Sequence, residues 1–248
     1  TEQDIKEKGY TDLNLILDDL PGFHTSRSYG DTYFKTYLRG FRNSLGTPFI
    51  LLVDGQYMND FFFNSAEILK TIPISNIERI EMVYGPASSL YGANALMGVL
   101  NIMTKKVEED TSSGHMNVSS VARNYVPGNL QQIVDFSYYS GDAPVRYSIT
   151  GRGHYGIEDP SNNEEYEYTK SSYTDDEDTW GGVLDNEHLV GNESRVRNLA
   201  LDSRVYAGDF EFGVMYYRMD QGYGVEYAGN ALQANSVWVE QERNIFLK

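Results

Sequence analysis

The chain has 248 residues, enough for one large domain or two of ordinary size. It carries 36 acidic and 20 basic side chains, and the net charge of -16 argues against a nucleic-acid-binding surface, because phosphates would be repelled. No stretch approaches the roughly 18 to 20 uninterrupted apolar residues of a membrane-spanning helix, which excludes a helical membrane protein. Cysteine is absent, and this leaves the compartment open.

The acidity belongs to the second part of the chain. Residues 1–107 hold 10 basic and 12 acidic side chains, whereas residues 108–248 hold 10 and 24. This shift in composition coincides with a change in the hydrophobic pattern. We therefore predict a first domain over residues 1–107 and a second unit over residues 108–248.

The first domain has the pattern of a small mixed sheet with short helices. A polar helix is expected over residues 2–8, ended by Gly9. Thr11 is expected to cap a second helix, which Pro21 stops. A third helix is expected over residues 64–72, with its apolar residues on one face. Four stretches have the composition of strands: residues 36–41, 48–55, 77–85 and 98–105.

The sequence of this domain gives little evidence for an enzyme active site. Asp54 follows a buried strand, where open α/β sheets often place a catalytic residue, but Asp-Gly is commoner as turn chemistry. Glu78 and Glu81 lie on opposite faces of one strand, so they cannot share a substrate. The four histidines have no metal-ligand spacing. We expect no catalytic residues.

The second unit reads as a series of antiparallel strands with alternating polarity. In the third strand, Val145, Tyr147 and Ile149 share one face, and Arg146 and Ser148 lie on the other. A soluble sandwich would turn the apolar faces inward, whereas an outer-membrane barrel turns them toward lipid. Each strand has about the 9 to 11 residues that cross a bilayer. The six strands are predicted over residues 115–123, 132–140, 145–155, 197–206, 210–219 and 237–247.

The connections favour the barrel. Short links follow the second and fourth strands, and longer polar links follow the first, third and fifth. The third link, residues 156–194, is acidic and far longer than usual connections in a compact domain. Short turns at one end and long loops at the other are typical of bacterial outer-membrane barrels. Tyrosines near the strand ends, such as Tyr138, Tyr155 and Tyr206, suit an interfacial girdle.

Several short motifs of the first domain occur in one order along residues 1–106. They are Leu20-Pro21-Gly22, Arg39-Gly40, Asp54-Gly55, Ile77-Glu78-Arg79-Ile80-Glu81, Gly85-Pro86, Leu90-Tyr91-Gly92 and Gly98-Val99-Leu100-Asn101-Ile102 with Thr104-Lys105. This succession closely resembles the plug domain of TonB-dependent outer-membrane transporters. One departure is Tyr84, which stands where relatives commonly carry a basic residue before Gly-Pro.

The resemblance implies an α+β plug domain followed by the first strands of an antiparallel transmembrane β-barrel of about 22 strands. Six strands alone would make a barrel too narrow for a plug of this size. We therefore expect this sequence to be the N-terminal portion of a longer transporter, with the segment offered to TonB lying outside it.

Family members take up scarce, bulky nutrients such as ferric siderophores, haem, cobalamin or oligosaccharides across the outer membrane of Gram-negative bacteria. The resemblance therefore implies active uptake of such a nutrient, most readily an iron complex, through a barrel gated by the plug. The implied partners are TonB with its inner-membrane energising complex, the nutrient or metal chelate, and outer-membrane lipid. Two alternatives remain: a non-transporting surface receptor or adhesin on the same scaffold, and a soluble α/β hydrolase joined to a β-sandwich.

The resemblance also implies contact sites. Plug loops that face the cell exterior should bind the ligand, although three consecutive phenylalanines could equally pack on the barrel wall. Arg39 and Arg79 look like the plug arginines that pair with barrel glutamates in relatives. The ligand-binding candidates are Arg27, Tyr29, Tyr33, Phe61, Phe62, Phe63 and Asn64.

The acidic third link has one further feature. Asp176, Asp178 and Glu187 have the spacing of an EF-hand-type calcium loop, but Trp180 occupies a ligand position and no flanking helices are evident. Two interpretations stay open: a calcium site on these three carboxylates, and a solvated surface loop. No other cofactor is expected.

Overall fold

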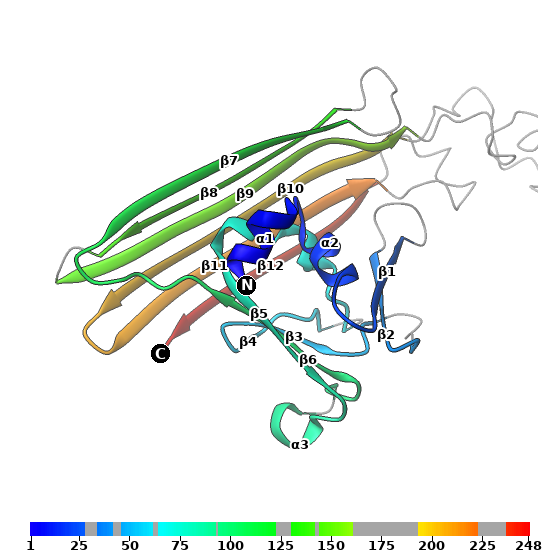
Figure 1. Ribbon diagram of the computed structural model, residues 1–248, viewed down its shortest axis with the longest axis horizontal. Helices are drawn as coiled ribbons and strands as arrows, with labels where there is room; N and C mark the ends of the chain where they lie inside the picture. Colours follow the sequence, from blue (N-terminus) through cyan, green and yellow to red (C-terminus); the bar gives the residue numbers. More distant parts are fainter. Residues whose placement is uncertain are drawn as a thin grey trace, which may run out of the picture.

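The structure is a computed structural model that describes residues 1–27, 34–41, 46–61, 64–92, 94–122, 130–141, 144–160, 193–222 and 237–248. It consists of an N-terminal domain packed against one face of a six-stranded antiparallel sheet (Figure 1). None of the helices among these residues is long and apolar enough to span a membrane.

The N-terminal domain opens with two short helices whose ends follow local capping rules. Helix α1 has Thr1 as its N-cap in a capping box, and left-handed Gly9 closes its last turn. Helix α2 is capped by Asp12, which accepts a hydrogen bond from the Leu15 amide at 3.2 Å. The prediction of Thr11 as this cap is wrong by one residue. The helices span Glu2–Lys8 (α1) and Leu13–Asp18 (α2).

The core of the N-terminal domain is a four-stranded sheet in the order β4-β3-β6-β5, beside a two-stranded β1-β2 hairpin. Strand β3 is buried throughout and pairs in parallel with β6. All four predicted strand stretches are confirmed, with small shifts at their ends. The strands are β1 (Phe23–Arg27), β2 (Phe34–Leu38), β3 (Ile50–Val53), β4 (Gln56–Tyr57), β5 (Ile77–Tyr84) and β6 (Gly98–Thr104).

Three short helical turns complete this domain. The predicted helix over residues 64–72 is instead a 3-10 turn, because Asn64 has a left-handed φ of 55° and ordinary helical bonds do not develop after it. Ile68 and Leu69 in this turn are fully buried. The turns are η1 (Glu67–Thr71), η2 (Ile74–Asn76) and α3 (Ser88–Tyr91).

The second unit is one sheet of six long strands in chain order. Each predicted strand is present, and β9 and β10 extend into the predicted third link, which leaves residues 161–192 between them. Antiparallel order places the three longer links at one end and the two short turns at the other. The strands are β7 (Ser112–Ala122), β8 (Leu130–Ser140), β9 (Val145–Pro160), β10 (Glu193–Ala207), β11 (Phe210–Gly222) and β12 (Val237–Leu247).

The two faces of this sheet have opposite polarity. On β9, Ser148, Thr150 and Arg152 are buried toward the N-terminal domain, while Tyr147 and Ile149 are exposed on the far face. Strands β8 and β10 follow the same pattern. A soluble sandwich would require the reverse, so that alternative is wrong. The polar faces meet protein, and the apolar faces meet the surroundings, as in a barrel wall.

Candidate functional site

The N-terminal domain meets the six-stranded sheet chiefly through η1 and η2, which contact β7 to β11. The two units share one apolar cluster. Ile68 and Leu69 of η1 belong to the same buried cluster as Ala200 of β10 and Met215 and Tyr217 of β11. This apolar contact is flanked by buried charges, which come from residues far apart in the sequence.

Arg204 on β10 carries the most highly connected of these charges. Its guanidinium binds Asp202 through two hydrogen bonds of 2.7 and 2.9 Å. The Nη1 atom lies 2.5 Å from a carboxylate oxygen of Asp54 and 3.3 Å from one of Glu211. The Arg204 side chain is only 4% exposed and that of Asp54 10%. One guanidinium therefore joins the N-terminal domain to β10 and β11 through three carboxylates.

Asp54 is held in position from both sides. It occupies the turn between β3 and β4 with a φ of 49°, and Gly55 follows with 81°, as a two-residue type I′ hairpin turn requires. Thr104 donates to the Asp54 carboxylate from its amide at 2.9 Å and from its hydroxyl at 2.7 Å. Lys248, directly after β12, donates to the Asp54 carbonyl at 2.9 Å. We call Asp54, Arg204 and Lys248 the anchor.

A second buried pair joins β8 and β9 to the chain between α1 and α2. Arg152 lies 2.8 Å from Asp135, and the two side chains are 1% and 2% exposed. The same guanidinium donates to the Thr11 carbonyl at 2.7 Å. Removing either charge would leave the other buried without its partner, which is costly in a low-dielectric interior.

A third contact joins η2 to the sheet. The hydroxyl of Tyr139 on β8 donates to the Asn76 side chain at 2.7 Å. On the other side of η2, Lys105 donates to the Ser75 carbonyl at 2.8 Å and forms a 2.8 Å ion pair with Glu2 of α1. Burial of Glu2 acts to raise its pKa, but hydrogen bonds from Lys105 and Lys6 outweigh this and lower the pKa.

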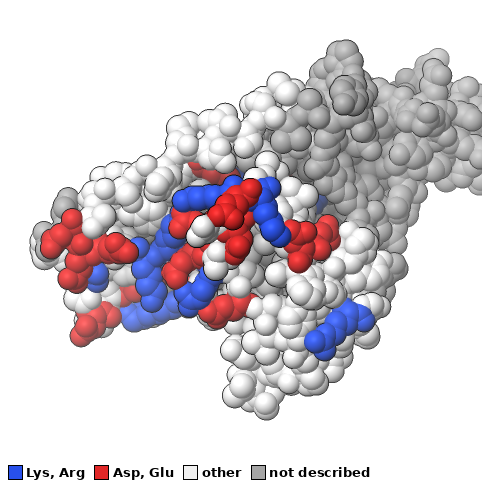
Figure 2. All heavy atoms as spheres, in the orientation of Figure 1, with Lys and Arg blue, Asp and Glu red and all other residues white. Residues whose placement is uncertain are grey.

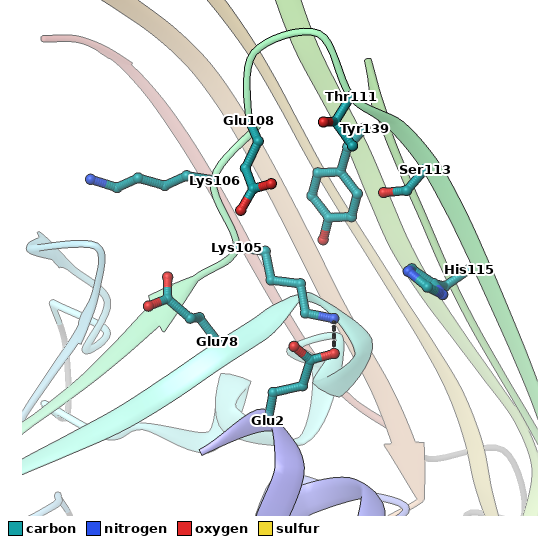
Figure 3. Close-up of a pocket in the computed structure, with 9 residues that line it drawn as sticks. All are labelled: Glu2, Glu78, Lys105, Lys106, Glu108, Thr111, Ser113, His115 and Tyr139. Atoms are coloured by element: carbon teal, nitrogen blue, oxygen red, sulfur yellow. Dashed lines mark ion pairs between the residues drawn. The ribbon is translucent and has the colours of Figure 1, made fainter. Parts of the chain in front are cut away.

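Two cavities lie between the N-terminal domain and β7. One, of about 410 Å³, is lined by Glu2, Lys105, His115 and Tyr139 among others, and Figure 3 shows the Glu2–Lys105 pair beside it. The other, of about 470 Å³, shares three of these residues and extends along α1 to Asn117. Figure 2 shows acidic and basic side chains crowded over α1 and the neighbouring elements, while the region of α3 carries few charges.

Only part of the predicted ligand-binding set can be placed. Phe61 is 98% exposed and stacks on Tyr57 with ring centroids 6.1 Å apart. Asn64 lies in the same neighbourhood and accepts a 2.7 Å hydrogen bond from the Tyr57 hydroxyl. Arg27 ends β1, and its side chain is outside the description. Tyr29, Tyr33, Phe62 and Phe63 lie outside the described residues.

The two predicted interface arginines bind within the N-terminal domain. Arg79 pairs with Glu78 and Glu81 of its own strand at 2.5 and 2.7 Å, and the Glu81 bond raises its pKa. The Arg39 guanidinium stacks 4.9 Å from the centroid of the Tyr84 ring, the aromatic residue before Gly-Pro. Among the described residues, neither arginine forms an ion pair with the six-stranded sheet, and their pairing with barrel glutamates stays a prediction.

The predicted calcium ligands Asp176, Asp178 and Glu187 lie outside the described residues. Within the parts of the chain that are described, no three His, Cys, Asp or Glu side chains gather closely enough to hold a metal ion.

Sequence reasoning missed the anchor. It treated Asp54 as turn chemistry, and the turn is indeed present, but the carboxylate also pairs with a residue 150 positions later in the chain. The sequence did contain a signal for these contacts. Arg152 and Arg204 lie on the polar faces of strands in which polar and apolar residues alternate. A charged side chain on the inner face of a plugged barrel needs a partner on the plug or on a neighbouring strand.

Comparison with known proteins agrees with this architecture. Residues 1–99 match the family model described as the TonB-dependent Receptor Plug Domain. The ferric enterobactin receptor PfeA of Pseudomonas aeruginosa, as its Q482A mutant with enterobactin, superimposes with a TM-score of 0.66 at 20% identity, covering 89% of this chain and 32% of that one. The siderophore receptor PirA of Acinetobacter baumannii gives 0.67 at 18% identity, covering 94% and 32%.

The ferric yersiniabactin uptake receptor FyuA of Yersinia pestis gives a TM-score of 0.59 at 17% identity, covering 88% of this chain and 30% of that one. The chain thus spans about a third of the length of these receptors. Identities this low show the fold alone, whereas the family model identifies the N-terminal domain, called the plug from here on. The N-terminal domain is therefore a TonB-dependent receptor plug domain, and it is followed by antiparallel strands that resemble the barrel of the superimposed receptors.

Proposed function

We propose that this protein acts in the TonB-dependent uptake of a ferric siderophore across the outer membrane of a Gram-negative bacterium. The observation that carries the proposal is the polarity of the sheet. Polar and charged side chains of β8 to β10 are buried against the plug, and their apolar neighbours are exposed on the opposite face. A sheet of this polarity can form part of a barrel wall, with the plug on its polar face and lipid on its apolar face. We call the six-stranded sheet the wall.

The substrate class is inferred from the solved structures that share the fold. Three of them are described as receptors for enterobactin, for yersiniabactin or for a siderophore. The described plug offers no redox or covalent chemistry to this substrate. It offers the exposed ring of Phe61, which stacks on the half-buried Tyr57 and suits contact with a bulky, partly aromatic chelate.

TonB is the proposed source of energy for release of the ligand inward. A plug held to the sheet by the buried Asp54–Arg204 ion pair and by the hydrogen bond from Arg152 to the Thr11 carbonyl does not leave the interface freely. Uptake therefore needs work done on the plug, and an energised partner in the inner membrane supplies it. Haem, cobalamin and oligosaccharides are the other substrates that the experiment below distinguishes.

The test uses the complete receptor expressed from its own gene. Its location is determined by membrane fractionation, and native mass spectrometry identifies the molecule that co-purifies. Accumulation of radioactive iron from ferric enterobactin and ferric yersiniabactin is then compared in strains with and without TonB. Uptake that requires both the receptor and TonB supports the proposal. Binding without uptake would indicate a surface receptor, and a water-soluble product would refute the membrane location.

A further inference from the structure

The face of the wall that is turned away from the plug is apolar and carries few charges. Leu199 is 50% exposed there and Ile245 69%. Further strands paired at either edge would widen the sheet and would leave this outward face uncovered. Its charged side chains, among those described, are Asp220 and three arginines on neighbouring strands: Arg197 of β10, Arg218 of β11 and Arg243 of β12.

The three arginines form a continuous diagonal across these strands, which lie side by side in Figure 1. Arg218 pairs in register with Leu199 on one side and with Gln241 on the other. Arg197 and Arg243 lie two residues beyond these partners, in opposite directions along the wall. Diagonal neighbours in an antiparallel sheet are about 7 to 8 Å apart. Each arginine is therefore close enough to the next for one small anionic group to contact both.

Two of the arginines are held in place by tyrosines. The Arg197 guanidinium lies 5.7 Å from the centroid of the Tyr155 ring, and that of Arg243 lies 5.8 Å from the centroid of Tyr216. Stacking of this kind occupies one face of the guanidinium and leaves the N–H groups in its plane open to another partner.

The positive charge of this diagonal is only partly compensated. Arg218 lies 3.6 Å from the Asp220 carboxylate, whose side chain is 13% exposed. Among the side chains that the structure describes, this is the one ion pair formed by the three arginines. Three positive charges therefore face one carboxylate, and the excess favours an anionic partner.

The arginines border the apolar part of the outward face on the side of the long links. Between each arginine and the opposite end of its strand, every residue of this face is uncharged. The row that contains Arg197 continues across β9, β8 and β7 as the neutral Tyr155, Gln132 and Ser120. Long links lie outside the cell in an outer-membrane barrel. In the location proposed above, the charges are thus concentrated at one place among the headgroups of the outer leaflet.

We propose that Arg197, Arg218 and Arg243 bind the headgroup of a lipid that carries at least two phosphates. Phosphate oxygens match the planar fork of the guanidinium group, which donates two parallel hydrogen bonds. The Cα atoms of the two stacked arginines are about 14 to 16 Å apart, two diagonal steps, so one phosphate does not contact both. The acyl chains would lie on exposed apolar residues such as Leu199 and Ile245. This inference rests on the proposed membrane location and goes beyond the proposed uptake.

The test uses the complete receptor, purified in detergent and washed free of lipid. Diphosphoryl lipid A and its monophosphoryl form are titrated in turn, and native mass spectrometry measures the bound fraction. The variants are Arg197→Gln, Arg218→Gln, Arg243→Gln and the triple variant. A triple Arg→Lys variant keeps the charges but lacks the planar fork. Lys106→Gln is the matched control, because it removes one exposed positive charge outside the wall.

We expect each single variant to weaken binding of the diphosphoryl probe about fivefold and the triple variant about a hundredfold. The triple variants with glutamine and with lysine should both lose the preference for two phosphates, while Lys106→Gln changes nothing. The single variants leave the buried ion pairs of the wall intact, so they decide the matter if the triple glutamine variant does not fold.

Two results would overturn the site: equal affinity of the unmodified receptor for both forms of the probe, or unchanged affinity in the glutamine variants. Displacement of the probe by inorganic phosphate alone would also overturn it, since a soluble anion would then be the ligand. Failure of the proposed uptake is distinct. A receptor that accumulates neither ferric chelate but prefers the diphosphoryl probe would refute uptake and support the lipid site.

Discussion

Replacing Arg204 should weaken the attachment of the plug more than replacing its partner Asp54. In Arg204→Met, the carboxylates of Asp54, Asp202 and Glu211 lose their shared guanidinium, and two of them are almost fully buried. Loss of one partner of a buried pair costs about 3 to 5 kcal/mol. In Asp54→Asn, the guanidinium keeps two carboxylates and the type I′ turn tolerates asparagine, so we expect about 1 to 3 kcal/mol.

The assay follows release of the plug from the wall in the purified, detergent-solubilised receptor. A reporter thiol at Ala200→Cys, buried in the apolar cluster that η1 shares with β10 and β11, reacts with a maleimide only when the interface opens. Denaturant titration of its reaction gives the free energy of opening for each variant. Arg204→Lys is the matched control, because it retains the charge but lacks the planar fork that binds two carboxylates.

The double variant decides whether the two residues act together. If Asp54 and Arg204 are coupled, the combined loss falls short of the sum of the single losses by about 0.5 to 3 kcal/mol. Losses that add within error, or an Arg204→Met receptor that opens at the same denaturant concentration as the unmodified one, would refute the anchor.

Three further predictions use the same receptor. Arg152→Gln should raise hydrogen exchange in the segment between α1 and α2, whose carbonyl it binds, and unchanged exchange there would contradict this role. The pKa of Glu2 is lowered below its ordinary value of 4.5, so its tether to the plug is complete above that pH and is lost as the pH falls through the folded-state pKa. Limited proteolysis should then show α1 cut increasingly on acidification, and Glu2→Gln should reduce this pH dependence to the part that comes from the Lys8–Asp19 pair. Gly98→Ala should abolish folded receptor in outer-membrane fractions, because a Cβ there would lie 2.2 Å from the Val83 carbonyl oxygen, whereas Gly40→Ala meets no atom within 4 Å and should cost only backbone strain.

Local chemistry made most of the fold predictable. Strand alternation located all six long strands, since the face buried against the plug is polar and the exposed face is apolar. The helix over residues 64–72 was wrong in type, because the left-handed φ of Asn64 does not fit the start of a right-handed helix and nothing in the sequence signals it. The cap of α2 was placed one residue early, because Thr11 and Asp12 both have capping side chains.

The contacts between the plug and the six-stranded sheet were harder to predict from the sequence. Asp54 was predicted only as a turn residue, and no periodicity links it to Arg204, 150 residues later in the chain. Arg39 and Arg79 were selected by resemblance and form their described bonds within the plug. Pairing partners depend on how two domains dock, and this information is spread over both of them.

The inward arginines also determine how the wall strands align with one another. A strand that slipped by one residue against its neighbour would exchange its two faces. For β9 the slip would turn Arg152 outward, and for β10 it would do the same to Arg204; in the proposed outer-membrane location each costs about 2 to 4 kcal/mol at the midplane of the bilayer. The arginines that bind the plug therefore also favour one register of strand pairing when the sheet assembles.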